Sequence, residues 1–219
     1  MGLLVHVFSV ACTEWKLIPT NPALLVRKPK IIEKRVRYLS AWERQRLLHA
    51  AKNCRVPCMY ALIVLALDTG ARKTELLNLK WSDVDIGNQR ILIWRRKNHR
   101  PHTVPISDFC LEVIVNWHQE LGEYIEEAEY VFVTMEGKKQ YIKDVWYEIL
   151  KKAELTNFKF HHLRSSCAVD ILNAGGSLMA VKQILGHESI NSTMVYSTLA
   201  ESSLNEVIQR SSSKFKLAH

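Results

Sequence analysis

The chain has 219 residues, and its hydrophobic fraction of 47% and charged fraction of 24% are those of an ordinary globular protein. Lysine and arginine total 30 against 22 aspartates and glutamates, which gives a formal charge of +8 and a pI of about 9.3. No apolar run is long enough for a membrane-spanning helix, so the class of helical membrane proteins is excluded. The excess of basic residues favours a phosphate-rich partner such as nucleic acid.

The cysteines and the N-terminal residues indicate in which cellular compartment the protein is expected. Five cysteines are scattered through apolar segments, which predicts reduced thiols in a cytoplasmic protein and not a disulfide framework or metal site. They are Cys12, Cys54, Cys58, Cys110 and Cys167. The apolar opening lacks a basic n-region and a clear cleavage site, so we expect no signal peptide.

The N-terminal part divides into an apolar segment and a basic stretch. The segment FSVACTEWKLIPTNPALLV predicts the end of a helix, a turn at Pro19 and Asn21-Pro22, and a short apolar piece. Residues 26–37 carry six lysines or arginines and one glutamate, which predicts an exposed linker. Such a linker either lies along a sugar-phosphate backbone or is a solvated connector, and the sequence leaves both open.

Helices and a hairpin are predicted next. Ser40 and Glu43 form a capping box that begins an amphipathic helix. The apolar stretch 59–70 predicts a buried central helix, followed by a further helix and a turn. Residues 89–94 and 102–107 are strand-like, and the basic connector between them predicts a hairpin.

The C-terminal half is predicted to be helical. Gly70 and Gly186 each stand where a helix is expected to end, and Gly186 suits a left-handed cap. Beyond Gly186 the chain is predicted to turn through HESIN and to restart a helix near Ser192. The remaining predicted elements are helices near 108–120, 143–153, 162–173, 177–185 and 193–210, and a short strand at 131–134. The predicted class is therefore mostly α with a small antiparallel β-sheet (α+β).

Six side chains are together suited to a displacement reaction at a phosphodiester, although each residue type alone more often has a structural role. They are Arg72, Lys97, His161, Arg164, His187 and Tyr196. A phosphodiester under attack gathers negative charge on its non-bridging oxygens, which guanidiniums bind in forked geometry. Histidines move protons near neutral pH, a lysine can protonate a leaving alkoxide, and a tyrosine hydroxyl can be the nucleophile. No acidic metal cluster is visible, so we expect side chains to supply the positive charge, with no metal or cofactor.

The order and spacing of these residues resemble the tyrosine recombinase (phage integrase) family over roughly residues 37–219. The matching motifs are TGAR with Arg72, KFHHLRSS with His161 and Arg164, LGH with His187, Tyr196 nine residues later, and Lys97 eight residues before Pro105. The resemblance implies the tyrosine recombinase catalytic-domain fold and a catalytic role for all six side chains.

Three neighbouring positions complete the comparison with the family. Glu75 matches an acidic residue that supports the first arginine, here Arg72. His162 falls on a variable position. Ser165 departs from the histidine common there, and we expect little harm because the position is not one of the six.

The resemblance also implies a domain organisation. Residues 1–38 are expected to be the remnant of the last helix of a core-binding domain plus a basic linker, and residues 39–219 the catalytic domain. Most of the N-terminal DNA-clamping domain is then missing. The candidate DNA-backbone contacts in the linker and the hairpin are Arg27, Lys28, Lys30, Lys34, Arg35, Arg95, Arg96 and Arg100.

The implied function is site-specific recombination. Tyr196 would attack a DNA phosphate to give a 3′-phosphotyrosyl bond, and a 5′-hydroxyl would reverse the attack without ATP or metal. Arg72, Arg164 and His187 would stabilise the phosphate. Lys97 would protonate the leaving oxygen, and the sixth residue, His161, would assist proton transfer.

The implied partners are double-stranded DNA, further copies of the chain in a tetrameric synapse, and accessory DNA-bending proteins. The setting would be bacterial or phage-encoded and nucleoid-associated. The tail offers an amphipathic segment with Leu204, Val207 and Ile208, which in the family docks on a neighbouring protomer; packing on its own domain is the alternative.

Two other functions stay open. One is a type IB topoisomerase-like enzyme that nicks and religates DNA without synapsis. The other is a non-catalytic DNA-binding remnant that occupies sites or inhibits an intact recombinase.

Overall fold

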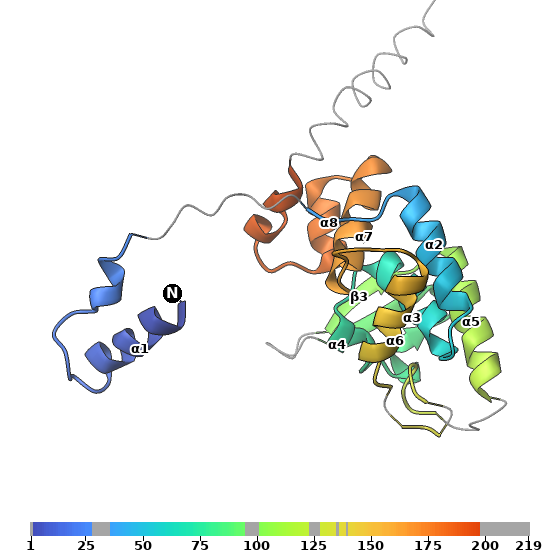
Figure 1. The fold of residues 1–219 in the computed structure, drawn as a ribbon, viewed down its shortest axis with the longest axis horizontal. Coiled ribbons are helices and arrows are strands. Elements are labelled where there is room, and N and C mark those ends of the chain that lie inside the picture. The colour runs from blue at the N-terminus through green and yellow to red at the C-terminus, as the bar shows by residue number, and fades with distance from the viewer. Residues whose placement is uncertain are drawn as a thin grey trace, which may run out of the picture. The chain divides into compact units, whose positions relative to one another are not determined.

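The structure, a computed structural model, describes residues 2–27, 36–94, 101–122, 128–134, 136–138 and 140–197. The chain divides into two compact units, residues 1–35 and residues 36–219 (Figure 1).

Asn21 closes the first unit. The helix α1 spans Gly2–Thr13, and η1, a 3-10 helix, spans Pro22–Leu24. The Asn21 side-chain amide donates to Val5 O at 2.9 Å, and its Oδ1 accepts from Ala23 N at 3.0 Å. The predicted helix end, turn and short apolar piece are therefore present, with an asparagine cap at the second helix.

The central helix of the second unit is α3, Cys58–Thr69. Its sequence CMYALIVLALDT contains one charged residue, so most of its surface is buried by the hydrophobic effect. Three helices pack against it, as Figure 1 shows: α2 (Ala41–Lys52), α5 (Asp108–Gly122) and α7 (His161–Asn173). The predicted buried helix is confirmed.

The remaining helices of this unit are shorter or peripheral. They are α4 (Lys73–Leu76), η2 (Trp81–Asp83), α6 (Lys143–Lys152), α8 (Leu178–Leu185), η3 (Ile190–Ser192) and η4 (Met194–Tyr196). The helix α6 packs on α2, and α8 packs on α7. The four helices predicted between residues 108 and 185 are confirmed to within two residues at each end.

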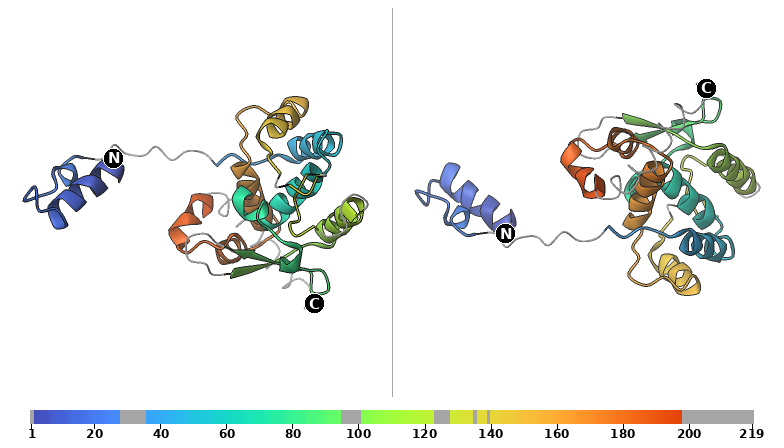
Figure 2. Two further views of the ribbon diagram at one scale, coloured as in Figure 1. Left: turned by 90° about the horizontal axis from the view of Figure 1, so that it is seen from below. Right: turned by 90° about the horizontal axis from the view of Figure 1, so that it is seen from above.

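Three antiparallel strands form the sheet in the order β1-β2-β3. They are β1 (Val84–Asp85), β2 (Arg90–Trp94) and β3 (Pro101–Pro105). Ile91 pairs with Val104, and both side chains face the core. Figure 2 shows the sheet on the side of the unit opposite α6. The predicted hairpin strands are confirmed, and the two-residue β1 was not predicted.

The strand predicted at residues 131–134 is wrong. Its three apolar residues are buried, but the segment is a loop bound to its surroundings. Val131 N donates to Leu79 O at 2.9 Å, and Trp117 Nε1 donates to Val131 O at 2.7 Å. The adjacent Tyr130 makes an isolated antiparallel bridge to Lys80 outside the three-stranded sheet, so the apolar run reflects core filling beside a local bridge and not an extended strand.

The helix predicted at 193–210 differs over its described part. The chain after Gly186 forms the consecutive 3-10 turns η3 and η4 in place of one α-helix. The remainder of that prediction, with Leu204, Val207 and Ile208, lies outside the described residues.

Arg37 binds the capping box at the start of α2. Ser40 N donates to Glu43 Oε2 at 2.9 Å, which completes the predicted box. Arg37 Nη1 donates to the same oxygen at 3.0 Å, and its guanidinium lies 5.2 Å from the centroid of the Phe158 ring. The Arg37 hydrogen bond is the largest cause that lowers the pKa of Glu43, to about 2. This ion pair therefore joins the segment before α2 to the body of the unit.

Glu43→Gln should lower the free energy of unfolding at pH 7 by about 1 kcal/mol, the typical cost of a weakened cap. The folded-state pKa of Glu43 lies below its ordinary value of 4.5, so this stabilisation is present above pH 4.5 and is lost as the pH falls toward 2. Urea unfolding of wild type and variant should converge at acid pH. A difference independent of pH would contradict the assignment, and the exposed Glu136→Gln is the control.

Candidate active site

The buried guanidinium of Arg164 joins the ends of two other helices. Arg164 lies on α7 and is 4% exposed. Its Nη1 donates to Gly70 O at 2.8 Å, and its Nη2 donates to Leu185 O at 2.7 Å. Carbonyls at helix C-termini have no partner within their own helix and carry partial negative charge. One side chain therefore fixes the ends of α3 and α8 relative to α7.

Both helix ends turn at a glycine in the left-handed region. The φ angle is 62° at Gly70 and 63° at Gly186, which confirms that both are C-terminal caps. A Cβ at Gly70 would collide with Leu185 Cδ2 and would approach Cys167 Sγ to 3.2 Å. The close approach of α8 to the end of α3 therefore requires glycine at position 70.

Arg72 follows Gly70 and is held by Glu75. Arg72 N donates to Glu75 Oε2 at 2.8 Å, and Arg72 Nη1 donates to Glu75 Oε1 at 2.8 Å. The Arg72 side chain is 45% exposed, whereas that of Glu75 is 10% exposed. The carboxylate thus anchors one edge of a guanidinium that still reaches solvent.

The pKa values of Arg164 and His161 depend on the neighbouring site residues. Burial is the main cause that lowers the pKa of Arg164 to about 10, and nearby Arg72 lowers it further. The Glu75 carboxylate and the Tyr196 phenol act in the opposite direction. The pKa of His161 is lowered by burial, then by Arg164 and Arg72. Two arginines, a histidine and the tyrosine are therefore within electrostatic range of one another.

His161 begins α7 at the edge of a cleft. The cleft is also lined by Arg72, by the lysines Lys73, Lys143 and Lys159, and by aromatic side chains. The adjacent His162 has a structural role, because its Nδ1 accepts from Lys159 N at 3.0 Å. The side chain at the variable position of the motif therefore binds the backbone just before α7. The cleft has the positive charge that a phosphate backbone needs.

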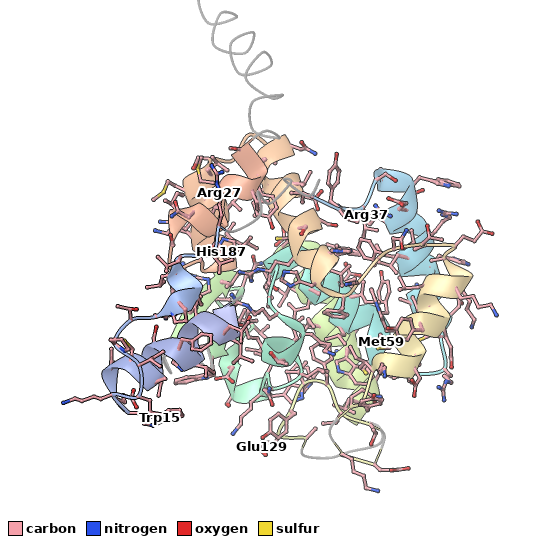
Figure 3. The ribbon with its side chains drawn as sticks, turned by 60° about the vertical axis from the view of Figure 1, so that its left-hand side comes forward. Trp15, Arg27, Arg37, Met59, Glu129 and His187 are labelled. Atoms are coloured by element: carbon pink, nitrogen blue, oxygen red, sulfur yellow. The ribbon has the colours of Figure 1, made fainter. Side chains whose placement is uncertain are left out.

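His187 and Tyr196 lie on the segment that follows α8. His187 N donates to Lys182 O at 3.0 Å, so the residue directly after Gly186 completes the helix cap. Figure 3 labels His187 beside the orange C-terminal helices. Its Nδ1 lies 2.9 Å from Thr193 Oγ1. Tyr196 is 6% exposed and packs against Cys167, Leu185 and other apolar residues of α7 and α8. The structure brings both residues to the Arg164 side of the unit.

Of the other predicted site residues, only Arg27 lies within the described part of the chain. Lys97 and the candidate DNA contacts Lys28, Lys30, Lys34, Arg35, Arg95, Arg96 and Arg100 lie outside the described residues. Arg27 is described and is exposed in the first unit. Over the described ranges, no group of three or more metal-ligating side chains occurs, and no helix is long and apolar enough to cross a membrane.

Sequence reasoning missed two features of this site. Thr193 carried no signal of its own, because a threonine in a turn is common and its histidine contact is tertiary. The three lysines of the cleft are far apart in sequence and converge only in the fold. Position three before Tyr196 was the one cue that could have drawn attention to Thr193.

The fold is that of a tyrosine recombinase catalytic domain. A profile of the phage integrase family matches residues 37–203, which is more than half of the chain. This chain therefore belongs to the phage integrase family, as the sequence motifs predicted.

Individual relatives agree with the family match. The shufflon-specific DNA recombinase of Escherichia coli is 29% identical over 204 residues, which cover 91% of this chain and 50% of that protein. The crystal structure of XerA recombinase is 28% identical with a TM-score of 0.67, covering 92% of this chain and 72% of that one. The catalytic domain of bacteriophage HP1 integrase is 26% identical with a TM-score of 0.63, covering 80% and 94%. The chain spans about half the length of curated relatives that it matches.

Gly70→Ala should destabilise the second unit by about 2 kcal/mol or more, because a non-glycine residue in the left-handed region costs roughly 1–2 kcal/mol and the new Cβ displaces Leu185. Urea unfolding measures the change. The control is Gly122→Ala, where a Cβ meets nothing within 4 Å. Equal stability of Gly70→Ala and wild type would show that α3 and α8 do not meet as described.

Proposed function

We propose that this chain cleaves and rejoins DNA strands through a covalent bond between Tyr196 and a 3′-phosphate. The observation that carries the proposal is the bonding of Arg164 to Gly70 O and Leu185 O, because it holds the segments of Arg72 and His187 beside one another. A site for a phosphate in displacement needs several fixed donors around its non-bridging oxygens. Membership of the phage integrase family supports the same chemistry.

In the proposed reaction the Tyr196 oxygen attacks phosphorus, a bond from phosphorus to this oxygen forms, and the bond to the 5′-oxygen breaks. The leaving 5′-oxygen takes a proton, for which Lys97 is the proposed donor. His161 is the proposed acceptor of the phenolic proton, because its lowered pKa leaves the imidazole neutral at pH 7. Attack by a 5′-hydroxyl reverses these steps, so the bond energy is retained and ATP is not consumed.

Arg72, Arg164 and His187 are the proposed phosphate ligands. Glu75 is proposed to hold Arg72 with its fork toward the oxygens, which its two hydrogen bonds to Arg72 support. Forked guanidinium contacts are stronger and more directional than contacts from an ammonium group.

Double-stranded DNA is the proposed substrate, bound first through its phosphates. The formal charge of +8 and the three lysines in the cleft with His161 support this. We also propose that residues 1–38 are a core-binding helix with a basic linker and that residues 39–219 are the catalytic domain, in line with the change of unit after residue 35. We further propose that the chain self-associates on DNA. The proposed location is the cytoplasm, where free thiols such as those of this chain stay reduced.

Tyr196→Phe should abolish both relaxation of supercoiled plasmid and SDS-resistant protein–DNA linkage, because the variant lacks the nucleophilic oxygen. Plasmid binding should change little. The control is Tyr60→Phe, because Tyr60 lies near the opposite end of α3 from Gly70. Linkage that survives Tyr196→Phe would remove Tyr196 from its role. Binding without any tyrosine-dependent reaction would favour a DNA-binding protein that inhibits an intact recombinase.

Lys143→Gln should weaken binding to all DNA sequences alike and should reduce the slope of log affinity against log salt by about 1, as expected for one lost phosphate contact. Lys143 lines the cleft beside His161. Lys52→Gln is the matched control. Lys52 lies on α2 over the ring of Tyr60 and does not line the cleft. Filter binding at several salt concentrations measures the slopes, and an unchanged slope would exclude Lys143 from the interface.

A further inference from the structure

A buried threonine connects the two functional residues that follow α8. Thr193 has 0% exposure, and its Oγ1 lies 2.9 Å from Nδ1 of His187. A hydroxyl that is fully removed from water requires a hydrogen-bond partner, and the imidazole nitrogen provides one. The contact is therefore part of the buried structure and not a surface encounter.

The main chain of Thr193 leads to the tyrosine. Thr193 N donates to Ile190 O at 2.7 Å, and Tyr196 N donates to Thr193 O at 3.0 Å. Thr193 thus ends the turn η3 and begins the turn η4. Its side chain binds the proposed phosphate ligand while its backbone fixes the start of the turn that carries the proposed nucleophile.

The hydrogen bond also bears on the position of the imidazole proton. A neutral imidazole has one donor nitrogen and one acceptor nitrogen, and the bond made by one nitrogen selects the state of the other. Nε2 can donate to a phosphate oxygen only when it carries the hydrogen, so Nδ1 must then accept from the threonine. The opposite tautomer would direct a lone pair at the anionic oxygen.

We propose that Thr193 is a positioning residue, which donates its hydroxyl hydrogen to Nδ1 of His187 and thereby holds the imidazole with Nε2–H directed to the scissile phosphate. The inference rests on the proposed function, and it adds a residue that none of the sequence motifs contained. Threonine suits the task because its β-branched side chain is stiff about χ1, so the hydroxyl keeps one direction.

The wild-type tautomer tests the proposal without any DNA. Two-dimensional ¹⁵N NMR of histidine-labelled protein distinguishes Nε2–H from Nδ1–H, and loss of one signal set in His187→Gln assigns this residue among the nine histidines. We expect the Nε2–H form in wild type and in Thr193→Ser. Thr193→Val, which has the same shape without a hydroxyl, should lower the fraction of the Nε2–H form toward that of a free neutral imidazole. An Nδ1–H tautomer in wild type would overturn the proposal.

Cleavage rates test the consequence for the reaction. Thr193→Val should slow single-turnover cleavage roughly tenfold or more, yet by less than the about 10²–10³-fold that removal of a whole transition-state donor costs. Thr193→Ser should restore a rate near that of wild type. Equal rates of Thr193→Val and wild type would contradict the proposal.

A double-mutant cycle separates positioning from a general structural effect. If Thr193 acts through the histidine, Thr193→Val should have no further effect on cleavage in the His187→Gln background. An equal slowing in both backgrounds would assign Thr193 a structural role alone. If wild type cleaves no DNA, the proposed function fails, whereas the NMR result still decides whether Thr193 sets the tautomer. If Thr193→Val does not fold, the tautomer of His187 in wild type and in Thr193→Ser still tests the proposal.

Discussion

The burial of one guanidinium is the constraint on which the rest of the site depends. A charged group removed from water is stable only when its donors are satisfied, and Arg164 satisfies two of them with Gly70 O and Leu185 O. Helix C-termini are suitable partners because their carbonyls are unpaired and carry partial negative charge. The ends of α3 and α8 are thereby brought to the same side of α7, although they are more than one hundred residues apart in the chain.

The residues after these two helix ends are the ones proposed to carry out the chemistry. Each helix stops at a left-handed glycine, and the chain then turns sharply into Arg72 in one case and His187 in the other. Glu75 orients the first of these side chains, and Thr193 contacts the second. Tyr196 lies one 3-10 turn further on, packed on the side of α7 that also presents Arg164. Backbone geometry at the two helix ends therefore sets the relative positions of Arg72, Arg164 and His187.

Much of this arrangement could be predicted from local sequence signals. The capping box at Ser40, the apolar run of α3 and the glycine caps are local, so a single sequence reveals them. The apolar run at 131–134 was misassigned because burial alone gives the same pattern as a strand. The two residues of β1 are too few to show any periodicity, and the Thr193–His187 contact exists only after the chain has folded. The motifs predicted which residues belong to the candidate site, whereas the carbonyl partners of Arg164 required the structure.

The most direct test concerns the atom that becomes joined to DNA. The protein would be reacted with a nicked duplex whose cleaved strand is lost by diffusion, so that the covalent complex accumulates, then digested with trypsin and nuclease and analysed by tandem mass spectrometry. We predict a nucleotide 3′-phosphate on the Tyr196 oxygen and a free 5′-hydroxyl on the released strand. A phosphate on any other residue, or a 5′-phosphoryl linkage, would contradict the assignment of Tyr196 as the nucleophile.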